Sequence, residues 1–536
     1  MSLPRRAFLQ EKESDEHVQK GFVYAGCLAG KFLFLLCLAA LTAALFFLCY
    51  PKFSYNLLAW LALAPFAIAI FNLRGFWKTF LWSWLTGTAT FAALYYWVFV
   101  TCRDGGGLSI SLSVAAWLGL SAVVGIQFAL FGGSCYYLRR SKGLFPFIAA
   151  MGWVALEYLH ELIACYILGF PWFALAYSQW NMPALIQVAS ITGAAGVSFA
   201  VAWVGLEIGY ALVVPSFKVS VRRMILAACI FLITYGAGAY YLKHVPSNNL
   251  LRLRAAIMQP NIDQYKKWDD AFVEEIKETI SAMNAQIKGQ QVMLTVWPES
   301  VLPGMAEGSY GSWMSQLAKE SQSFQVVGTN RAEGKNQYVS AALFNPEGEI
   351  VGSYDKVHLV PFGETIPFES TIRSLFPDVT VLGELGFFHA GKWPQKLLQI
   401  DQISFGSTIC YESVFSHLWR EQAKTGARFF VNITNDAWFF DTAAPYQHLA
   451  VSVLRAVETH RPVLRAANTG ISAVISPTGE ILSRASFDTR AILQTEVSLP
   501  LGLDVSFYTQ WSDWFSWLCL VVYLTVLISS FVFIYE

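Results

Sequence analysis

Two long apolar stretches enclose a segment of ordinary composition, and this division limits what the chain can fold into. Residues 21–243 and 511–535 are almost continuously hydrophobic, whereas residues 247–508 mix polar and apolar residues as water-soluble domains do. A helix needs roughly 20 apolar residues to cross a bilayer. Eight segments are candidates for such helices: 32–50, 54–73, 77–100, 110–137, 145–168, 182–214, 223–242 and 512–535. We therefore expect a membrane domain with seven helices over 1–246, an extramembrane domain over 247–508 and a C-terminal membrane helix over 509–536.

The positively charged residues of the short loops predict how these helices are oriented, because cytoplasmic loops of membrane proteins are enriched in Lys and Arg. Alternate loops carry the cations: Arg74 and Lys78, then Arg139, Arg140 and Lys142, then Lys218, Arg222 and Arg223. We therefore expect both termini in the cytoplasm and the extramembrane domain on the outer face. The leader before the first span carries Glu11, Glu13, Asp15 and Glu16, unlike the basic start of a cleaved signal peptide, so we expect the first span to stay as an anchor.

The extramembrane segment alternates between strand-like and helix-like patterns, which indicates an α/β domain. Strands are predicted at Leu253–Met258, Val292–Trp297, Phe324–Thr329, Val339–Phe344, Ile403–Ile409, Arg428–Ile433, Val463–Ala467 and Ser472–Ser476, and helices at Asp269–Ile287, Trp313–Ser321, Val414–Lys424 and Gln447–Thr459. The formal net charge is zero, so nothing suggests a nucleic-acid partner. The sequence has no clustered metal-ligand motif and no glycine-rich phosphate loop, so we expect no metal and no cofactor.

Cys410 is the only one of the nine cysteines that lies in the extramembrane segment. It follows the apolar run 403–409 and precedes a helix-like pattern, so we place it at a strand-to-helix junction. There the positive end of the helix dipole favours the nucleophilic thiolate. Glu299 and Lys356 each follow another strand-like run and supply a carboxylate and an amine. A lone buried cysteine is more often an inert core residue, so the case for chemistry depends on all three residues together.

Three phrases carry a resemblance to the nitrilase, or carbon–nitrogen hydrolase, superfamily: Val-Trp-Pro-Glu-Ser around Glu299, Tyr-Asp-Lys-Val-His around Lys356 and Ile-Cys-Tyr-Glu around Cys410. Members of that superfamily use a Glu, Lys, Cys triad in this chain order. The predicted spans, with Gly-Phe-Pro-Trp at 169–172 and Asn-Asp-Ala-Trp-Phe at 435–439, narrow the resemblance to the bacterial apolipoprotein N-acyltransferase family. The resemblance implies an αββα sandwich beside the membrane helices, in the bacterial inner membrane, with the catalytic domain on the periplasmic face.

The resemblance also implies a role for each residue of the triad. Cys410 attacks an ester carbonyl of a membrane phospholipid, and Glu299 takes the thiol proton. Lys356 stabilises the thiolate and the oxyanion, helped by the backbone N–H groups after Cys410. The resulting thioester passes its acyl chain to the α-amino group of an S-diacylglyceryl-cysteine apolipoprotein. The expected partners are therefore a phospholipid donor, a diacylglyceryl apolipoprotein acceptor and the lipid bilayer.

Further residues are candidates for roles around the triad. They are the supporting residues Glu364, Tyr411 and Glu412 and the substrate-binding residues Trp172, Trp268 and Trp438. Glu364 is expected as a second carboxylate that orients the lysine or the glutamate. Glu412 either orients the lysine or caps the following helix, and Tyr411 either donates near the acyl oxygen or packs. Trp268 and Trp438 either line the substrate mouth or pack. The segment 169–172, which includes Trp172, is either a re-entrant or loop segment in contact with lipid or only the end of a helix. Phe440 stands where related chains commonly carry glycine.

Three other interpretations fit some of the residues. A membrane-tethered amidase would use the same triad with water as the second substrate. A transporter or scaffold with a degenerate domain would favour charges inside the membrane, where Glu157 and Glu161 lie one helical turn apart. A Cys–His pair would need His358 or His448 beside Cys410, together with a third group that no motif places.

Overall fold

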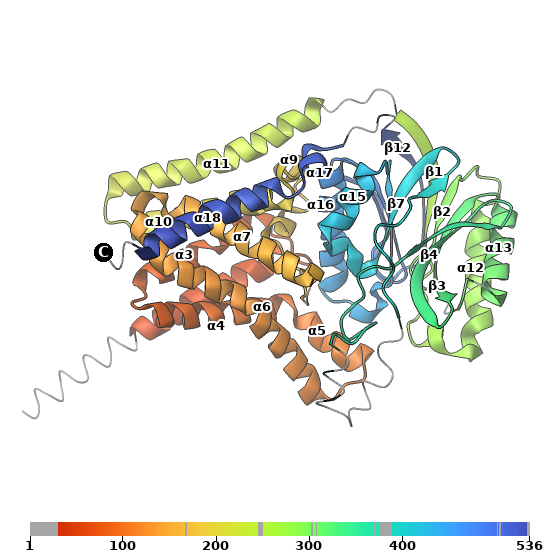
Figure 1. Cartoon of the computed structure of the whole chain (residues 1–536), viewed down its shortest axis with the longest axis horizontal. Helices are drawn as coiled ribbons and strands as arrows, with labels where there is room; N and C mark the ends of the chain where they lie inside the picture. Colours follow the sequence, from red (N-terminus) through yellow and green to blue (C-terminus); the bar gives the residue numbers. More distant parts are fainter. Residues whose placement is uncertain are drawn as a thin grey trace, which may run out of the picture.

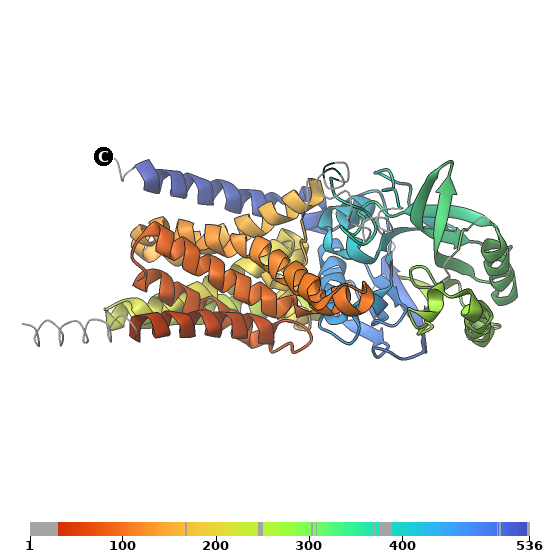
Figure 2. The same cartoon turned by 90° about the horizontal axis from the view of Figure 1, so that it is seen from below.

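The computed structural model describes residues 30–532, except for 167–168, 245–249, 302–303, 307, 369–370, 372–373, 375–387, 501 and 503–504. A bundle of helices forms one end of the molecule, and two β-sheets with their covering helices form the other (Figure 1). The long helices run side by side toward the sheets, as the view from below also shows (Figure 2). Residues 533–535 of the predicted last membrane helix lie outside the described residues.

The helices of the bundle follow the apolar segments of the sequence. The longer ones are Gly30–Cys49, α4 (Phe76–Leu94), α6 (Ile110–Leu138), α7 (Phe145–Tyr166), α10 (Ala194–Val213), α11 (Phe217–His244) and α18 (Trp514–Val532). The shorter ones are η1 (Asn56–Leu58), α2 (Ala59–Ala62), α3 (Ala64–Asn72), α5 (Tyr96–Val100), η2 (Thr101–Gly105), η3 (Arg139–Leu144), η4 (Leu175–Gln179), α8 (Pro183–Ile186), α9 (Ala189–Thr192) and α17 (Phe507–Trp511). Within the described residues, 5 helices are long and apolar enough to cross a membrane, or up to 6 if the pair bent by 60° after Leu94 is one span.

Several predicted spans are interrupted in the structure. The apolar stretch at 54–73 is divided among η1, α2 and α3, and the long stretch at 182–214 is divided at Gly193. Gly193 has a φ angle of 68°, which glycine adopts without strain and which separates α9 from α10. The break at Gly193 lies beside the extramembrane domain, where the Ala194 N–H donates to Glu458 Oε1 at 2.8 Å.

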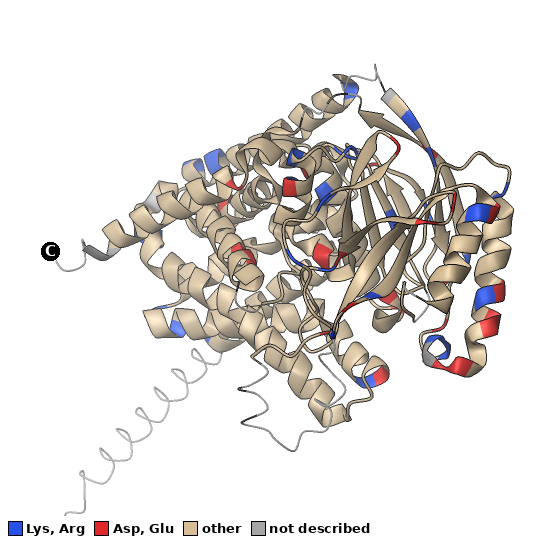
Figure 3. Ribbon diagram, turned by 45° about the vertical axis from the view of Figure 1, so that its right-hand side comes forward, with Lys and Arg blue, Asp and Glu red and all other residues tan. Residues whose placement is uncertain are grey.

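The basic residues of the segments around Arg139 and Arg223 lie at the end of the bundle away from the sheets. The Arg139 guanidinium donates to the Leu73 carbonyl oxygen at 2.9 Å, and that of Arg223 donates to the Gly143 carbonyl oxygen at 2.7 Å. These loops precede or follow α3, α6, α7 and α11. Figure 3 shows that the membrane helices otherwise carry few charged residues, whereas charges are frequent over the sheets and their helices.

Two six-stranded sheets pack face to face in the extramembrane domain, in the orders β12-β1-β2-β3-β4-β5 and β11-β10-β9-β8-β7-β6. The strands are β1 (Leu250–Gln259), β2 (Leu294–Val296), β3 (Phe324–Glu333), β4 (Asn336–Phe344), β5 (Ile350–Asp355), β6 (Leu398–Ile400), β7 (Ile403–Ile409), β8 (Phe430–Thr434), β9 (Val463–Ala467), β10 (Ala473–Ile475), β11 (Ile481–Arg484) and β12 (Ala491–Pro500). Strands β1 to β3 are parallel, as are β7 to β9, and the outer pairs are antiparallel.

Helices cover both outer faces of the sandwich. α12 (Val273–Ile287) and α13 (Ser309–Ser321) cover the first sheet, and α15 (Ser416–Lys424) and α16 (Ala444–Thr459) cover the second (Figure 1). The expected αββα sandwich beside a helical membrane domain is thereby confirmed. Every strand predicted from the sequence is present, and the four strands that the prediction lacked, β5, β6, β11 and β12, are the four edges of the two sheets.

The buried apolar side chains fall into three clusters. One lies between the two sheets and includes Ile257, Val296 and Ile433, and a second lies between the first sheet and its helices. The third is continuous from the membrane helices through α15 and α16 to the second sheet. The second sheet therefore shares a core with the membrane domain, which the division of the sequence into apolar and mixed segments does not indicate.

Candidate active site

The three residues of the predicted triad lie together where strands of both sheets end. Glu299 follows β2 and Lys356 follows β5 of the first sheet, whereas Cys410 follows β7 of the second. The Lys356 Nζ atom lies 3.0 Å from Glu299 Oε1, and both side chains are buried. The charges of Glu299 and Lys356 both act on the buried Cys410 thiol. Each sheet therefore contributes part of one enclosed site.

Lys356 is held between two carboxylates. Its Nζ atom donates to Glu364 Oε1 at 2.7 Å as well as to Glu299, and Glu364 Oε2 accepts from the Val360 backbone N–H at 2.9 Å. Burial opposes the charged amine, but the carboxylates of Glu299 and Glu364 outweigh it and raise the pKa of Lys356 well above its ordinary value. Lys356 therefore stays a cation, and Glu364 helps to fix its position.

Cys410 begins the short 3₁₀ helix η8 (Cys410–Val414) directly after β7. Its φ angle of 51° lies in the left-handed region, which costs a non-glycine residue about 1–2 kcal/mol and recurs at functional sites. Burial raises the pKa of the Cys410 thiol, Glu299 adds to this, and Lys356 offsets only part of it. The expectation that a helix dipole favours the thiolate at rest is therefore wrong: the thiol keeps its proton until a base removes it.

Glu412 connects the two sheets through its buried carboxylate. Its Oε1 atom accepts hydrogen bonds from the Val357 N–H at 2.6 Å, the His358 N–H at 3.2 Å and the Tyr354 hydroxyl at 3.0 Å. Its Oε2 atom accepts from the Ile409 N–H at 2.8 Å. Burial raises the pKa of Glu412 to about 7, although the backbone hydrogen bonds work in the other direction. Glu412 thus ties the segment after the lysine of the triad to the end of β7.

Tyr411 connects the site to the membrane domain. Its hydroxyl donates to the Gly169 carbonyl oxygen at 3.1 Å, and its ring stacks on Phe170 with the centroids 5.8 Å apart. Trp172 continues the stack, with its centroid 5.4 Å from that of Phe170. The Trp172 Nε1–H donates to Gln447 Oε1 of α16 at 2.9 Å. Tyr411 and Trp172 thus dock the residue after Cys410 and the helix α16 onto the same membrane-domain segment.

The other two tryptophans lie elsewhere. Trp438, in η9 (Asp436–Phe439), is 39% exposed and approaches Gly105 of the membrane domain, where a Cβ atom would lie 3.3 Å from its ring. Trp268 ends η5 (Lys266–Trp268), and its side chain is outside the part of the chain that the structure describes. Phe440 has a φ angle of 50°, a conformation that glycine would adopt without strain.

Sequence reasoning missed two buried neighbours of Glu299. The Asn435 backbone N–H donates to Glu299 Oε2 at 2.9 Å, so both sheets hold this carboxylate. Lys267 is buried, and its Nζ atom donates to the Glu299 carbonyl oxygen at 3.4 Å. Burial lowers the pKa of Lys267 to about 8, against the attraction of Glu299. Lys266 and Lys267 are adjacent, and the sequence does not indicate which of them is buried.

The histidines of the Cys–His alternative make other contacts. His448 lies beside Cys410, but its Nε2 atom is 2.9 Å from the backbone carbonyl oxygen of Cys410. His358 pairs with His417, with their Nε2 atoms 3.3 Å apart, and stacks on Phe415. Neither contact takes a proton from the Cys410 sulfur, so Glu299 remains the base in our interpretation.

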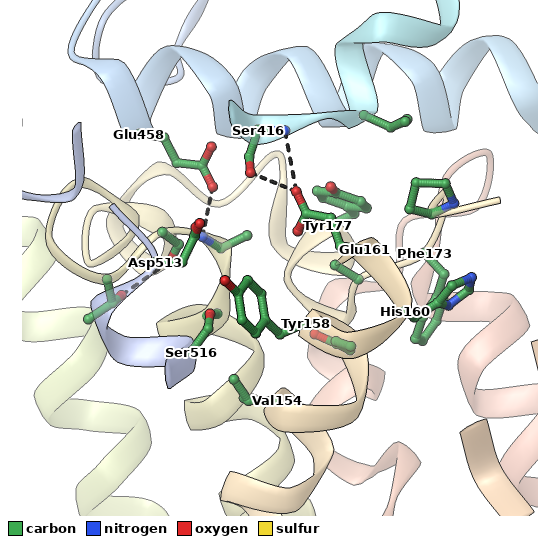
Figure 4. Close-up of a pocket in the computed structure, with 18 of the residues that line it drawn as sticks. Val154, Tyr158, His160, Glu161, Phe173, Tyr177, Ser416, Glu458, Asp513 and Ser516 are labelled. Atoms are coloured by element: carbon green, nitrogen blue, oxygen red, sulfur yellow. Dashed lines mark hydrogen bonds between the residues drawn. The ribbon is translucent and has the colours of Figure 1, made fainter. Parts of the chain in front are cut away.

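Glu157 and Glu161, for which the sequence suggests no clear role, line a cavity between the two domains (Figure 4). The cavity has a volume of about 50 Å³ and also meets Arg455 of α16. Glu161 Oε1 accepts from the Ser416 hydroxyl at 2.7 Å, and Glu157 Oε1 accepts from the Leu175 N–H at 2.9 Å. Glu161 therefore joins α7 to the helix that follows η8 in the extramembrane domain.

The arrangement of the triad suits nucleophilic acyl transfer. A protonated thiol, a buried carboxylate and a lysine cation supply a nucleophile, a base and a fixed charge for a developing oxyanion. Among the residues that the structure describes, no group of three or more His, Cys, Asp or Glu side chains is arranged to hold a metal ion.

Comparisons with known proteins cover most of the chain. Residues 254–502 match the carbon-nitrogen hydrolase family, and residues 42–206 match the apolipoprotein N-acyltransferase N-terminal domain. An apolipoprotein N-acyltransferase of Geobacter metallireducens is 35% identical over 90% of this chain and 92% of its own length. One of Allorhizobium ampelinum is 32% identical over 81% of this chain and 82% of its own.

Among solved structures, Nit3 of Saccharomyces cerevisiae, a member of the nitrilase superfamily, is 18% identical, covers 46% of this chain and 89% of its own, and has a TM-score of 0.36. The two family matches account separately for the membrane part and the extramembrane part. The bacterial relatives match both parts in one chain. The protein therefore belongs to the apolipoprotein N-acyltransferase family.

Proposed function

We propose that this enzyme transfers an acyl chain from a membrane phospholipid to the N-terminal amine of an S-diacylglyceryl-cysteine apolipoprotein. In the first half-reaction Glu299 removes the Cys410 proton while the sulfur attacks the ester carbonyl carbon. The tetrahedral intermediate collapses to a thioester, and the lysophospholipid leaves with that proton. In the second half-reaction Glu299 takes a proton from the lipoprotein amine, which attacks the thioester and releases Cys410 as the thiol.

The electrostatics of the site support these roles. The buried thiol needs a base, and the charge of Glu299 already acts on it. Lys356 remains charged between Glu299 and Glu364, so it meets the developing oxyanion without reorganisation. We assign supporting roles to Glu364, which holds the lysine, and to Glu412, which holds the two sheets in register.

The observation that carries the proposal is that the nucleophile lies against the membrane domain. Tyr411 follows Cys410 directly, hydrogen-bonds to Gly169 and stacks on Phe170. Both proposed substrates keep their acyl chains in the bilayer, so their reacting groups reach only a site close to its surface. A water-using amidase needs no such construction, and the relatives' names do not favour one.

We assign the substrate mouth to the three tryptophans predicted from the sequence. Trp438 is partly exposed and lies beside Gly105 at the end of η2 in the membrane domain, which suits contact with lipid. Trp172 is buried in the stack beside Tyr411, which suits a wall of the site rather than its rim. Trp268 belongs to this proposal on its position in the sequence alone.

We also place the protein in the bacterial inner membrane, with the sandwich on the periplasmic face and the spans in residues 1–246 and 509–536. The support is the distribution of charge: the basic loops at Arg139 and Arg223 lie at the end of the bundle away from the sandwich. Loops rich in Lys and Arg stay on the cytoplasmic side of a membrane. The sandwich, at the other end of the bundle, then lies on the periplasmic side.

Trapping the acyl-enzyme tests the function directly. Detergent-solubilised protein is incubated with phospholipid labelled in its acyl chain, and hydroxylamine-sensitive label is then measured on the wild type and on Cys410→Ala. We expect label on the wild type and none on Cys410→Ala, since only a thioester at that sulfur forms. Adding a synthetic diacylglyceryl peptide should move the label to the peptide amine. Folded wild-type protein that takes up no label would overturn the proposed donor.

A further inference from the structure

His448 lies on α16 behind the nucleophile and is fully buried. Its Nε2 atom is 2.9 Å from the carbonyl oxygen of Cys410, and its Nδ1 atom is 2.9 Å from Asp436 Oδ1. Asp436 Oδ2 in turn accepts from the Arg465 guanidinium at 2.8 Å. Three buried polar side chains therefore connect β9 to the backbone of the nucleophile, and the proposed reaction uses none of them.

The two partners of the imidazole determine where its protons lie. A backbone carbonyl oxygen only accepts, so Nε2 carries a proton in this contact. Burial opposes the charge of Asp436, but Arg465 and His448 outweigh it and lower the pKa of Asp436 to about 2, so this carboxylate also accepts. Both contacts together are satisfied by an imidazolium with a proton on each nitrogen; burial and Arg465 lower the pKa of His448 and oppose this charge, whereas Asp436 favours it. Asp436 thus orients the ring so that Nε2 points at Cys410.

The contact with the carbonyl oxygen also sets the direction of the next N–H. The carbonyl and the N–H of a trans peptide group point in opposite directions within one rigid plane. Anchoring the Cys410 carbonyl on α16 therefore directs the Tyr411 N–H away from that helix. In the layered sandwich, the side away from α16 is the side of the first sheet, which carries Glu299 and Lys356.

We propose that His448, oriented by Asp436, is a positioning residue that aims the Tyr411 N–H at the oxyanion formed when Cys410 is acylated. Cys410 needs such an anchor because its left-handed φ of 51° is not a conformation that a cysteine adopts unaided. Trp172 covers one side of the imidazole, with the ring centroids 5.1 Å apart, and so limits its movement. The proposal rests on the proposed function only in taking Cys410 as the residue that is acylated.

Two small reagents separate aiming the N–H from simply holding the thiol. p-Nitrophenyl acetate acylates a thiol through an oxyanion, whereas iodoacetamide alkylates it at a saturated carbon and forms none. Both adducts are quantified on the Cys410 peptide by mass spectrometry in full-length protein. His448→Leu removes the N–H that holds the Cys410 carbonyl oxygen, whereas His448→Gln keeps a side-chain N–H that can do so. His389→Gln is a matched control at an exposed histidine.

We expect His448→Leu to slow acylation about 100-fold, the usual effect of losing an oxyanion donor, and to change alkylation by less than about threefold. His448→Gln should recover acylation to within about tenfold of the wild type, and His389→Gln should match the wild type. Unchanged acylation in His448→Leu would overturn the proposal. Equal losses of acylation and alkylation would also overturn it, because His448 would then act on the thiol or on the fold.

The same experiment distinguishes this proposal from the proposed function. A wild type that is acylated at Cys410 by the small ester but never by labelled phospholipid would sink the phospholipid donor and leave the role of His448 standing. A wild type that is alkylated at Cys410 but not acylated by either ester would overturn both, because no oxyanion would then be stabilised at this residue.

Discussion

The two halves of the sandwich are covered by helices of opposite character. α12 buries one stripe, Ile276, Ile280, Met283, Asn284 and Ile287, and leaves its other face to water. In α16 every residue except Tyr446 is buried. The difference arises because α12 has only the first sheet beneath it, whereas α16 lies between the second sheet and the membrane helices (Figure 1).

This contrast extends to the site. The first sheet contributes Glu299 and Lys356, whereas the second contributes Cys410, whose neighbour Tyr411 contacts the membrane domain. A helix buried on all sides carries polar residues only where each finds a partner. Gln447 of α16 meets this requirement by accepting from Trp172. The half of the site that carries Cys410, the proposed nucleophile, is therefore completed by the membrane domain, whereas the half that carries Glu299, the proposed base, is built within the extramembrane domain.

The largest effect is expected at Lys356, where the two halves meet. Lys356→Met leaves the carboxylates of Glu299 and Glu364 buried without their cation, which we expect to cost about 3–5 kcal/mol in the free energy of unfolding. Acylation of Cys410 should fall by about 10³-fold or more, since the charge for the oxyanion is lost. Denaturant unfolding and the rate of acyl-enzyme formation measure the two effects. Lys319→Met, on the exposed face of α13, is the control, and acylation within tenfold of the wild type would contradict the assignment.

The buried helix should also make stability depend on pH. Burial raises the pKa of Glu458 on α16 to about 7, in spite of Arg455, above an unfolded value of about 4.3. The folded protein therefore binds this proton more tightly than the unfolded chain does. The associated stability of about 4 kcal/mol is complete below about pH 4.3 and is lost as the pH rises through 7.

The measurement is the unfolding temperature between about pH 5 and about pH 8. We expect it to fall in the wild type as the pH rises and to fall less in Glu458→Gln, which cannot ionise, while the buried Glu412 contributes the same slope to both proteins. Glu320→Gln changes an exposed carboxylate of α13, on the other half of the sandwich, and should keep the wild-type slope. Identical slopes in Glu458→Gln and the wild type would show that α16 does not hold the proton.

A smaller effect is expected at Glu412, whose carboxylate connects the two sheets. Glu412→Gln replaces an acceptor of four hydrogen bonds by an amide that accepts with only one atom, which should cost about 2 kcal/mol. We expect acylation of Cys410 to slow by about 10- to 100-fold, because the segment after Lys356 is no longer tied to β7. Rates measured beside Glu320→Gln test this. If only the stability changed and the rate did not, Glu412 would be a cap and not a positioning residue.

The smallest effect is expected at the contact with the membrane domain. Tyr411→Phe keeps the stack on Phe170 and removes one hydrogen bond to Gly169, which is worth about 1 kcal/mol. Acylation should stay within about fivefold of the wild type. A loss above about 100-fold would favour the other role expected for Tyr411, donation near the acyl oxygen.

The sequence predicted the central strands of the sandwich and lacked its edges. Strands such as β7 and β9 are buried on both faces and therefore read as continuous apolar runs. β5 and β11 are only partly buried, because an edge strand has a neighbouring strand on one side only. Their amino-acid sequences therefore resemble those of loops. β5 and β11 are strands because they pair with β4 and β10, and this pairing is not visible in their own sequences.

The candidate site also combines features that the sequence predicted with features that only the structure shows. The sequence by itself predicted a multi-span membrane part, although the structure interrupts several of the eight predicted spans, and its resemblance to the nitrilase superfamily implied the αββα class and a triad of Glu299, Lys356 and Cys410. Apolar length and short motifs are local properties of the chain. Only the tertiary structure decided that Cys410 rests as a buried thiol and that His448 holds its carbonyl. Burial and hydrogen-bond partners come from residues distant in sequence, so no local pattern records them.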